Sequence, residues 1–90
     1  RMILLPDEIF SLQSHNHRSE YWLVVEGVAT VECGKERKLL SKHESTFIPL
    51  GAKHRLSNMG EDVLKIIEVQ IGDELSEDDI IRYEDRYDRN

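Results

Sequence analysis

Apolar and polar residues alternate in short runs along this chain, and each run ends at turn-forming residues. The clearest run covers 20–26, where Glu20, Trp22 and Val24 share one face and the intervening residues take the other. Both faces of the run are largely apolar, so we expect this strand to be covered on both sides, in a closed barrel or at an interface. A longer strand is expected over 63–71, directly before a glycine.

Shorter strands are expected around these two, because β-favouring residues lie between clusters of Gly, Pro, Asn and Asp. About eight short strands with turns at regular intervals predict an all-β barrel or jelly roll. The expected ranges of the shorter strands are 2–5, 9–13, 28–33, 37–40, 46–48 and 53–57.

The C-terminal tail has a different pattern. Ser76, with Asp79 three residues later, forms a weak capping box for a helix. Ile80, Tyr83 and Tyr87 then fall on one helical face. We therefore expect a short helix or a turn that packs on the barrel, with the acidic residues of the tail in solvent.

Length and composition limit the class of protein. Ninety residues make one small domain covering 1–90. The chain begins with Arg1-Met2, so we interpret it as a fragment of a longer chain, although a processed end would look the same. A net charge of −6 argues against a nucleic-acid partner, which would require a basic surface. No apolar run approaches the roughly 20 residues of a membrane span, and no signal-like segment occurs. Cys33 is the single cysteine and cannot form an internal disulfide, which predicts a reducing, cytoplasmic location.

Histidines and a glutamate in two separate segments suggest a metal site. His15 and His17 are two residues apart, so on an extended segment they project from the same face and can reach one point. Glu20 has the opposite parity and joins them only if the chain turns or bulges at Arg18-Ser19. His54 follows a turn-rich segment before another short strand. Three histidines and one glutamate would leave coordination positions open on a divalent metal, which is the condition for catalysis.

Both segments resemble the two motifs of the cupin family. The first motif is a glycine, five residues, His-x-His, three or four residues, Glu, six residues and Gly; here the leading position is Ile9, and only two residues separate the His-x-His pair from the glutamate. The second motif, Pro-x-Gly-x-x-His-x-x-x-Asn, is matched in full, although its usual upstream glycine is His43. The matching residues are His15, His17, Glu20 and Gly27 in the first motif, and Pro49, Gly51, His54 and Asn58 in the second.

Further segments narrow the resemblance to the type II phosphomannose isomerase domain, and they cover nearly the whole chain. The shortened His-to-Glu spacing looks like a trait of this subfamily. The resemblance implies a cupin-type double-stranded β-helix, and a domain that commonly forms the C-terminal part of bifunctional mannose-1-phosphate guanylyltransferases. The segments are Ser11-Leu12-Gln13, His15-x-His17-Arg18, Glu20 with Trp22, Ile48-Pro49-Leu50-Gly51, His54-Arg55-Leu56, Ile67-Glu68-Val69-Gln70, Glu77-Asp78-Asp79-Ile80 and Arg82-Tyr83-Glu84-Asp85.

The implied function is the metal-dependent interconversion of mannose 6-phosphate and fructose 6-phosphate, in the route to GDP-mannose. The resemblance implies that His15, His17, Glu20 and His54 hold a divalent metal such as Zn, Mn or Co. The reaction moves a proton between carbons 1 and 2 through an enediol, which requires a Lewis acid and a base. Arg18 and Glu20 are the candidate catalytic residues, with Arg18 stabilising the enediolate or gripping the phosphate. A ligated carboxylate is a poor free base, so the sequence does not identify the proton carrier.

Other polar residues are candidates for binding the sugar phosphate. Lys53 and Arg55 flank His54 and could attract the phosphate. Glu68 and Gln70 are the polar members of an otherwise apolar strand, and a sugar's hydroxyl groups would satisfy them. We also expect a homodimer that covers an outer sheet face, because residues 21–25 are apolar on both faces.

Two alternative functions stay open. The chain could be a non-catalytic cupin module that binds a metal and a sugar phosphate beside an N-terminal nucleotidyltransferase domain. It could also be an Fe(II) cupin oxygenase, since many cupins use the same ligands. No glycine-rich nucleotidyltransferase loop occurs in these residues, so guanylyl transfer is not expected to be their own chemistry.

Overall fold

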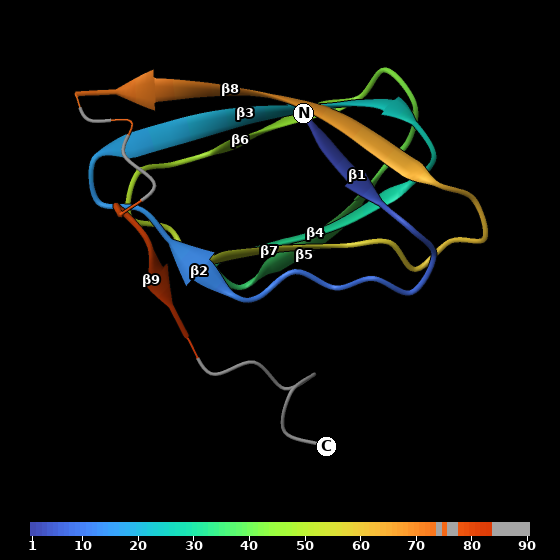
Figure 1. Cartoon of the computed structure of the whole chain (residues 1–90), viewed down its shortest axis with the longest axis horizontal. Coiled ribbons are helices and arrows are strands. Elements are labelled where there is room, and N and C mark those ends of the chain that lie inside the picture. The colour runs from blue at the N-terminus through green and yellow to red at the C-terminus, as the bar shows by residue number, and fades with distance from the viewer. Residues whose placement is uncertain (74, 76–77, 84–90) are drawn as a thin grey trace.

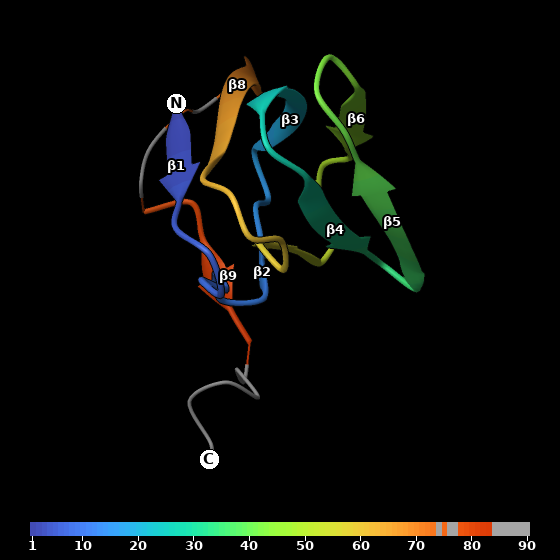
Figure 2. The same cartoon turned by 90° about the vertical axis from the view of Figure 1, so that its right-hand side faces the viewer.

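The computed structural model describes residues 1–73, 75 and 78–83, which form two antiparallel sheets facing each other (Figure 1). After the first strand the chain crosses from one sheet to the other, as the view in Figure 2 also shows. The first sheet has the strand order β1 (Met2–Leu4), β8 (Leu64–Gly72), β3 (Arg18–Glu26) and β6 (Ser45–Ile48). The second sheet has the order β5 (Glu36–Leu40), β4 (Ala29–Cys33), β7 (His54–Ser57), β2 (Gln13–Ser14) and β9 (Ile81–Arg82).

Strand β3 is central to the first sheet, because it pairs with β8 on one side and β6 on the other. Its alternation is the one that the sequence predicts: Glu20, Trp22 and Val24 are buried between the sheets, while Tyr21 and Leu23 face outward. Hydrophobic burial on the inner face and the pleat of the strand together determine which side chains reach the interior. The prediction of an all-β fold is confirmed.

The apolar core fills one end of the space between the sheets. Leu4, Val24, Leu64 and Ile66 are fully buried there, and the antiparallel register places Val24 opposite Ile66. Residues earlier in β3 and later in β8 lie toward the other end, where polar side chains begin. The remaining buried apolar side chains are Trp22, Ala29, Val31, Leu40, Ile48 and Leu56.

The outer surface of the first sheet is apolar and exposed. Its large side chains stand on β3, β6 and β8, and the Tyr21 and Phe47 rings lie 4.9 Å apart between their centroids. The described residues therefore cover β3 on its inner face and leave its outer face open. We call this surface the outer apolar face; it consists of Tyr21, Leu23, Phe47, Ile67, Val69 and Ile71.

The described part of the tail is extended. Ile81 and Arg82 form β9, which pairs with Ser14 and Gln13 of β2. The helix that we considered over this segment is therefore not formed by residues 78–83, because their backbone groups bond to another strand instead of to each other. Residues 76, 77 and 84–87 of the same expectation lie outside the described residues. In the part of the chain that is described, no helix is long and apolar enough to cross a membrane.

Candidate active site

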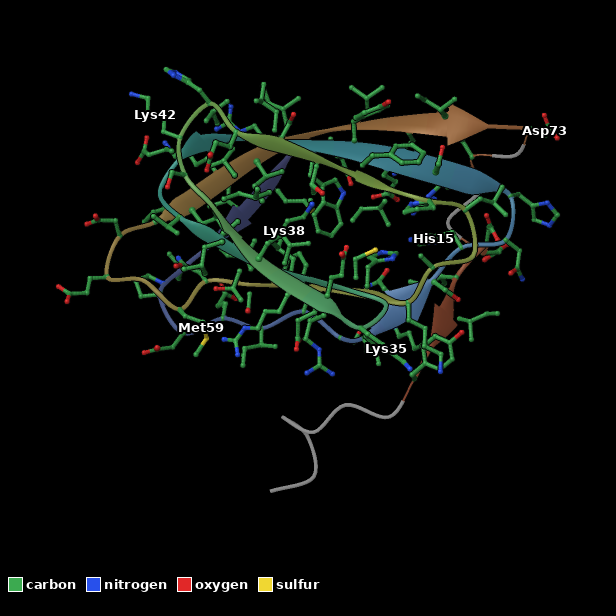
Figure 3. The ribbon with its side chains drawn as sticks, turned by 180° about the vertical axis from the view of Figure 1, so that it is seen from behind. His15, Lys35, Lys38, Lys42, Met59 and Asp73 are labelled. Atoms are coloured by element: carbon green, nitrogen blue, oxygen red, sulfur yellow. The ribbon has the colours of Figure 1, made fainter. Side chains whose placement is uncertain are left out.

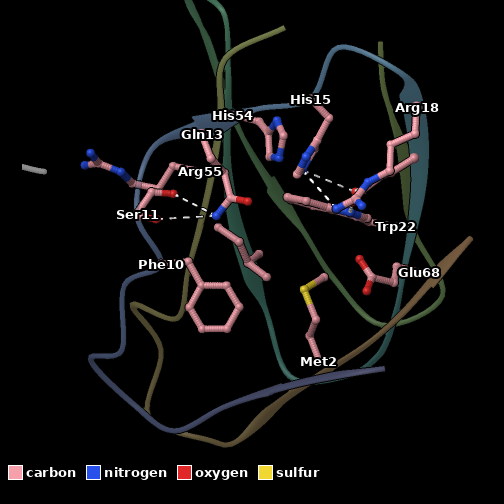
Figure 4. Close-up of a pocket in the computed structure, with 12 residues that line it drawn as sticks. Met2, Phe10, Ser11, Gln13, His15, Arg18, Trp22, His54, Arg55 and Glu68 are labelled. Atoms are coloured by element: carbon pink, nitrogen blue, oxygen red, sulfur yellow. Dashed lines mark hydrogen bonds and ion pairs between the residues drawn. The ribbon is translucent and has the colours of Figure 1, made fainter. Parts of the chain in front are cut away.

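A cavity of about 180 Å³ opens between the sheets, at the end away from Val24 and Leu64, and Trp22 and Leu56 of the core line part of it. His15 lies between the two layers in Figure 3, and Figure 4 shows His15, His54 and Arg18 gathered on one wall. Met2, Phe10 and Leu56 form an apolar part of the lining. The polar wall is formed by His15, Arg18, Glu20, Trp22, His54 and Glu68.

The side chains of the two buried histidines, His15 and His54, are adjacent. In each ring, Nδ1 is hydrogen-bonded to a backbone carbonyl oxygen. Their ring centroids are 5.2 Å apart. Nδ1 of His15 lies 2.6 Å from the carbonyl oxygen of Asp79, and Nδ1 of His54 lies 3.0 Å from that of Ala52. Because a carbonyl oxygen can only accept, each neutral ring must carry its proton on Nδ1. Nε2 of each ring is then left with its lone pair.

Glu20 is a buried carboxylate with donors on both oxygens. The Trp22 indole N–H donates to Oε1 over 2.8 Å, and Nε of Arg18 donates to Oε2 over 2.9 Å. Burial raises the pKa of Glu20, but the hydrogen bonds from Trp22 and Arg18 and the nearby positive charges outweigh it and hold the pKa below its usual range. Glu20 is therefore ionised inside the protein, and the alternation along β3 turns its side chain inward.

Arg18 joins the carboxylate to one of the histidines. Besides its bond to Glu20, its Nη2 lies 3.2 Å from Nε2 of His15. The side chain is mostly buried, so this contact is shielded from solvent. Gly72 makes room for it, because a Cβ at that position would lie 2.7 Å from the Arg18 Cα across the β3–β8 pair. Arg18 thus lies beside Glu20 and His15, two of the predicted metal ligands.

His54 lies against Trp22, with ring centroids 5.5 Å apart in an edge-to-face arrangement. Burial lowers the pKa of His54, and although the Ala52 carbonyl and Glu20 oppose this change, the pKa stays below its usual range. The neutral imidazole that results is the form that binds metals.

Not every predicted site residue reaches the cavity. His17 is exposed and does not line it, because Asn16 and His17 form a bend instead of an extended segment, so the expected shared face of His15 and His17 does not exist. Lys53 is exposed, with its ammonium nitrogen 4.3 Å from the centroid of the Tyr83 ring. Gln70 is half-buried beside Glu20 in the strand register, but it is not among the lining residues.

Arg55 and Glu68 do line the cavity. Nη1 of Arg55 lies 3.9 Å from an oxygen of Glu32, its neighbour across β4 and β7. Glu68 lies opposite Trp22 in the register of β3 and β8. Burial raises the pKa of Glu68, and the Glu20 carboxylate raises it further through its charge and a hydrogen bond.

Residues 1–85 match the family described as mannose-6-phosphate isomerase, C-terminal. The chain belongs to this family. It is 52% identical over 89 residues to the xanthan biosynthesis protein XanB of Xanthomonas campestris pv. campestris, covering 99% of this chain and 19% of that protein. It is 51% identical over 89 residues to the mannose-1-phosphate guanylyltransferase ManC of Salmonella typhimurium, covering 99% and 18%. The chain thus spans about a fifth of the length of these relatives.

Solved structures show the same fold. A Klebsiella pneumoniae protein with a double-stranded β-helix domain superposes with a TM-score of 0.79 at 18% identity, covering 91% of this chain and 70% of that chain. A Cupin 2 conserved barrel domain protein from Salinispora arenicola gives 0.71 at 17% identity, covering 79% and 59%. The predicted cupin fold and the resemblance to the isomerase family are both confirmed.

The resemblance to the isomerase family predicts a divalent metal ion at this site. The described residues hold no preformed group of three or more His, Cys, Asp or Glu in metal-binding geometry. The donor chemistry nevertheless fits a divalent metal, because the tautomers of His15 and His54 each leave an unprotonated Nε2 and Glu20 is ionised. Arg18 is hydrogen-bonded to two of these three donors, so a metal would have to share them with it or displace it.

Sequence reasoning missed one residue of the site, Asp79. Its carbonyl oxygen accepts from His15, yet in the sequence it reads as an acidic residue of a solvent-facing tail. The only sequence signal was its place in the segment Glu77-Asp78-Asp79-Ile80, which carries part of the family resemblance.

Proposed function

We propose that this chain is a metal-dependent isomerase domain that interconverts mannose 6-phosphate and fructose 6-phosphate, in the route to GDP-mannose. The observation that carries the proposal is the buried cluster of Glu20, Arg18 and His15, with His54 beside it, in a cavity of a chain that belongs to this family. His15, Glu20 and His54 would hold the metal, and His17 stays a predicted fourth ligand. A bound divalent ion would supply Lewis-acid polarisation of the sugar's carbonyl oxygen.

The chain's own residues account for binding and charge. The cavity of about 180 Å³ is smaller than the usual ligand pocket, so it accommodates the sugar end of the substrate and leaves the phosphate at its mouth. Arg18 directs a guanidinium into the cavity and stabilises negative charge that develops on the enediolate. Glu68 accepts hydrogen bonds from sugar hydroxyl groups on the opposite side, and Arg55, Lys53 and Gln70 stay predicted substrate contacts.

A direct assay tests this function. Purified protein, depleted of metal and then supplied with Zn²⁺, Mn²⁺ or Co²⁺ in turn, is mixed with fructose 6-phosphate, and formation of mannose 6-phosphate is followed. We expect turnover with at least one metal and none after depletion. Binding of the sugar phosphate without turnover would instead support a non-catalytic module, and oxygen consumption with Fe²⁺ would support an oxygenase.

His54→Ala tests whether His54 is a metal ligand. The variant should bind the active metal at least tenfold more weakly, because a direct ligand is lost. It should also lose the stabilisation that bound metal gives the folded state, seen as a smaller rise in melting temperature on adding metal. His43→Ala is the matched control, since His43 is an exposed loop histidine. Unchanged metal content in His54→Ala would remove His54 from the site.

The outer apolar face is covered by a second copy of this chain. Six large side chains that are each about half exposed present roughly 500 Å² of apolar surface, which is at the upper end for a monomer. Ser19 and Ser45, which lie among them on the outward side, carry no charge. Two copies of net charge −6 can therefore bring these faces together without opposing like charges. In the full-length protein we place a nucleotidyltransferase domain before this one, by analogy with the ManC relative, and a cytoplasmic location stays a prediction.

A further inference from the structure

The tail segment 79–83 is bonded along the strand that leads to His15. Ile81 and Arg82 pair with Ser14 and Gln13, so β9 continues the second sheet beyond β2 (Figure 1). The Tyr83 N–H donates to the Leu12 carbonyl over 2.8 Å. The Tyr83 hydroxyl also lies 2.9 Å from Oγ of Ser14. The tail therefore follows residues 12–14 closely and arrives at the site beside His15.

Asp79 makes three contacts with the segment that carries His15. Its two carboxylate oxygens each accept a backbone N–H, from Asn16 and from His17, both over 2.8 Å. Its own carbonyl oxygen accepts from Nδ1 of His15 over 2.6 Å. The residue is 8% exposed, so water competes little for these bonds.

These contacts determine two properties of the site. The carbonyl fixes the tautomer of His15, because a ring bonded to a carbonyl must carry its proton on that nitrogen. The carboxylate holds two consecutive amides of the bend, and the chain enters β3 at Arg18 directly after it. The bend therefore determines the position of His15 relative to Arg18 and Glu20.

We propose that Asp79 is a positioning residue of this site: its carboxylate holds the Asn16-His17 bend, and its carbonyl fixes the His15 ring with the proton on Nδ1 and the Nε2 lone pair toward Arg18 and the cavity. Asp79 lines no part of the cavity, so it acts through His15 and not on the substrate. This positioning role deepens the proposed function and rests on it only where metal binding is measured.

The ring nitrogens of the histidines provide the direct test. Two-dimensional ¹H–¹⁵N spectra of the imidazoles, recorded where histidines are neutral, report which nitrogen carries the proton. In the unaltered protein we expect His15 and His54 both in the Nδ1–H form. Asp79→Ala keeps the main-chain carbonyl but loses the carboxylate that ties residue 79 to the Asn16-His17 bend, so the carbonyl should no longer be held against His15. We therefore expect His15 to populate both tautomers while His54, held by Ala52, keeps its pattern and serves as an internal control. An unchanged His15 pattern in folded Asp79→Ala would overturn the proposal.

A second variant and a matched control keep the test decisive. Asp79→Asn keeps one acceptor oxygen and sets an N–H group against the other amide, so it should shift the His15 pattern in the same direction, to a smaller extent, even if Asp79→Ala fails to fold. Asp73→Asn removes the same charge from an exposed position and should leave both histidines unchanged. A shift in Asp73→Asn equal to that in Asp79→Asn would reduce the effect to general electrostatics and overturn the proposal.

Metal titration separates this proposal from the proposed function. Asp79→Ala should bind Co²⁺ about 10- to 100-fold more weakly than the unaltered protein, as is usual when the partner of a ligating histidine is lost. If the unaltered protein bound no metal while the His15 tautomer still responded to Asp79, the proposed function would fail and the positioning role would stand. Equal Co²⁺ affinity in both proteins would count against the positioning role itself.

Discussion

The two ends of the space between the sheets are built from the same strands and yet are held together differently. β3 and β8 supply Val24 and Ile66 to the apolar end, and Glu20 and Glu68 to the cavity end. Val24, Ile66 and Glu20 are almost fully buried, and Glu68 is half-buried. At the apolar end, hydrophobic burial stabilises the packing of Val24 and Ile66, whose side chains require no directional partner.

At the cavity end, Glu20 and His15 are buried polar groups with directional partners. Glu20 accepts from Trp22 and Arg18, and His15 is held by Asp79 and Arg18. Such groups would be costly to bury alone, so their bonds determine one geometry instead of many. The comparison teaches that substitutions at the apolar end should chiefly change stability, and substitutions at the cavity end should chiefly change chemistry.

The largest effect is expected from Leu64→Ala, at the apolar end. It leaves a void in a fully buried position and should lower the free energy of unfolding by about 2–5 kcal/mol, measured by urea denaturation. Metal affinity of the folded fraction should stay within about twofold, because the cavity is at the other end. Leu39→Ala, at an exposed position, is the control. A large loss of metal affinity in folded Leu64→Ala would break the distinction between the two ends.

Arg18→Ala is the converse test at the cavity end. Loss of a shielded charge-assisted contact to the developing oxyanion should lower kcat about a hundredfold, while the fold and bound metal are kept. Arg18→Lys should recover only part of the rate, because an ammonium group cannot reproduce the planar fork between Glu20 and His15. Arg37→Ala, which removes an exposed arginine, should have normal turnover. Near-normal kcat in metal-loaded Arg18→Ala would return Arg18 to a purely structural role.

Glu68→Gln sharpens the assignment of roles within the cavity. If Glu68 binds sugar hydroxyl groups, the variant should raise KM about tenfold with a smaller change in kcat, since the amide presents an N–H donor where the carboxyl group has an oxygen. Steady-state kinetics with fructose 6-phosphate measure both constants. A fall in kcat of a hundredfold or more at unchanged KM would instead identify Glu68 as the proton carrier.

Val69→Glu on the outer apolar face should have the smallest effect on chemistry. Two copies would then bring carboxylates together, so light scattering should return a mass near 10.5 kDa for the variant and twice that for the unaltered protein. Isomerase activity per chain should change less than twofold, because the face is on the opposite side of β3 from the cavity. If the unaltered protein were a monomer, the proposal that a second copy covers the outer apolar face would be wrong.

Sequence patterns predicted the strands well where burial alone decides them. The run over 20–26 became β3 and the run over 63–71 became β8, each within two residues of its expected bounds. The motif residues Glu20 and His54 also meet in one cavity. Both results follow from local alternation and from motifs whose spacing is visible in the chain.

The bend at Asn16-His17 and the strand at 81–82 could not be predicted in this way. The bend depends on Asp79, which is 62 residues further along the chain from His17, and no local pattern encodes such a bond. At Ile81 and Arg82 the helical pattern is overridden, because pairing with β2 satisfies their backbone groups. His17 was placed on the face of His15 from an alternation that holds only in extended segments.

The contact between Asp79 and His15 has a consequence for the newly made chain. His15 leaves the ribosome 64 residues before the carbonyl that will hold its ring. All the described side chains of the apolar core precede Asp79 in the chain, so each of them leaves the ribosome before the tail does. The sheets could then be compact before the site is complete. The proposed isomerase activity would begin only when β9 has paired with β2.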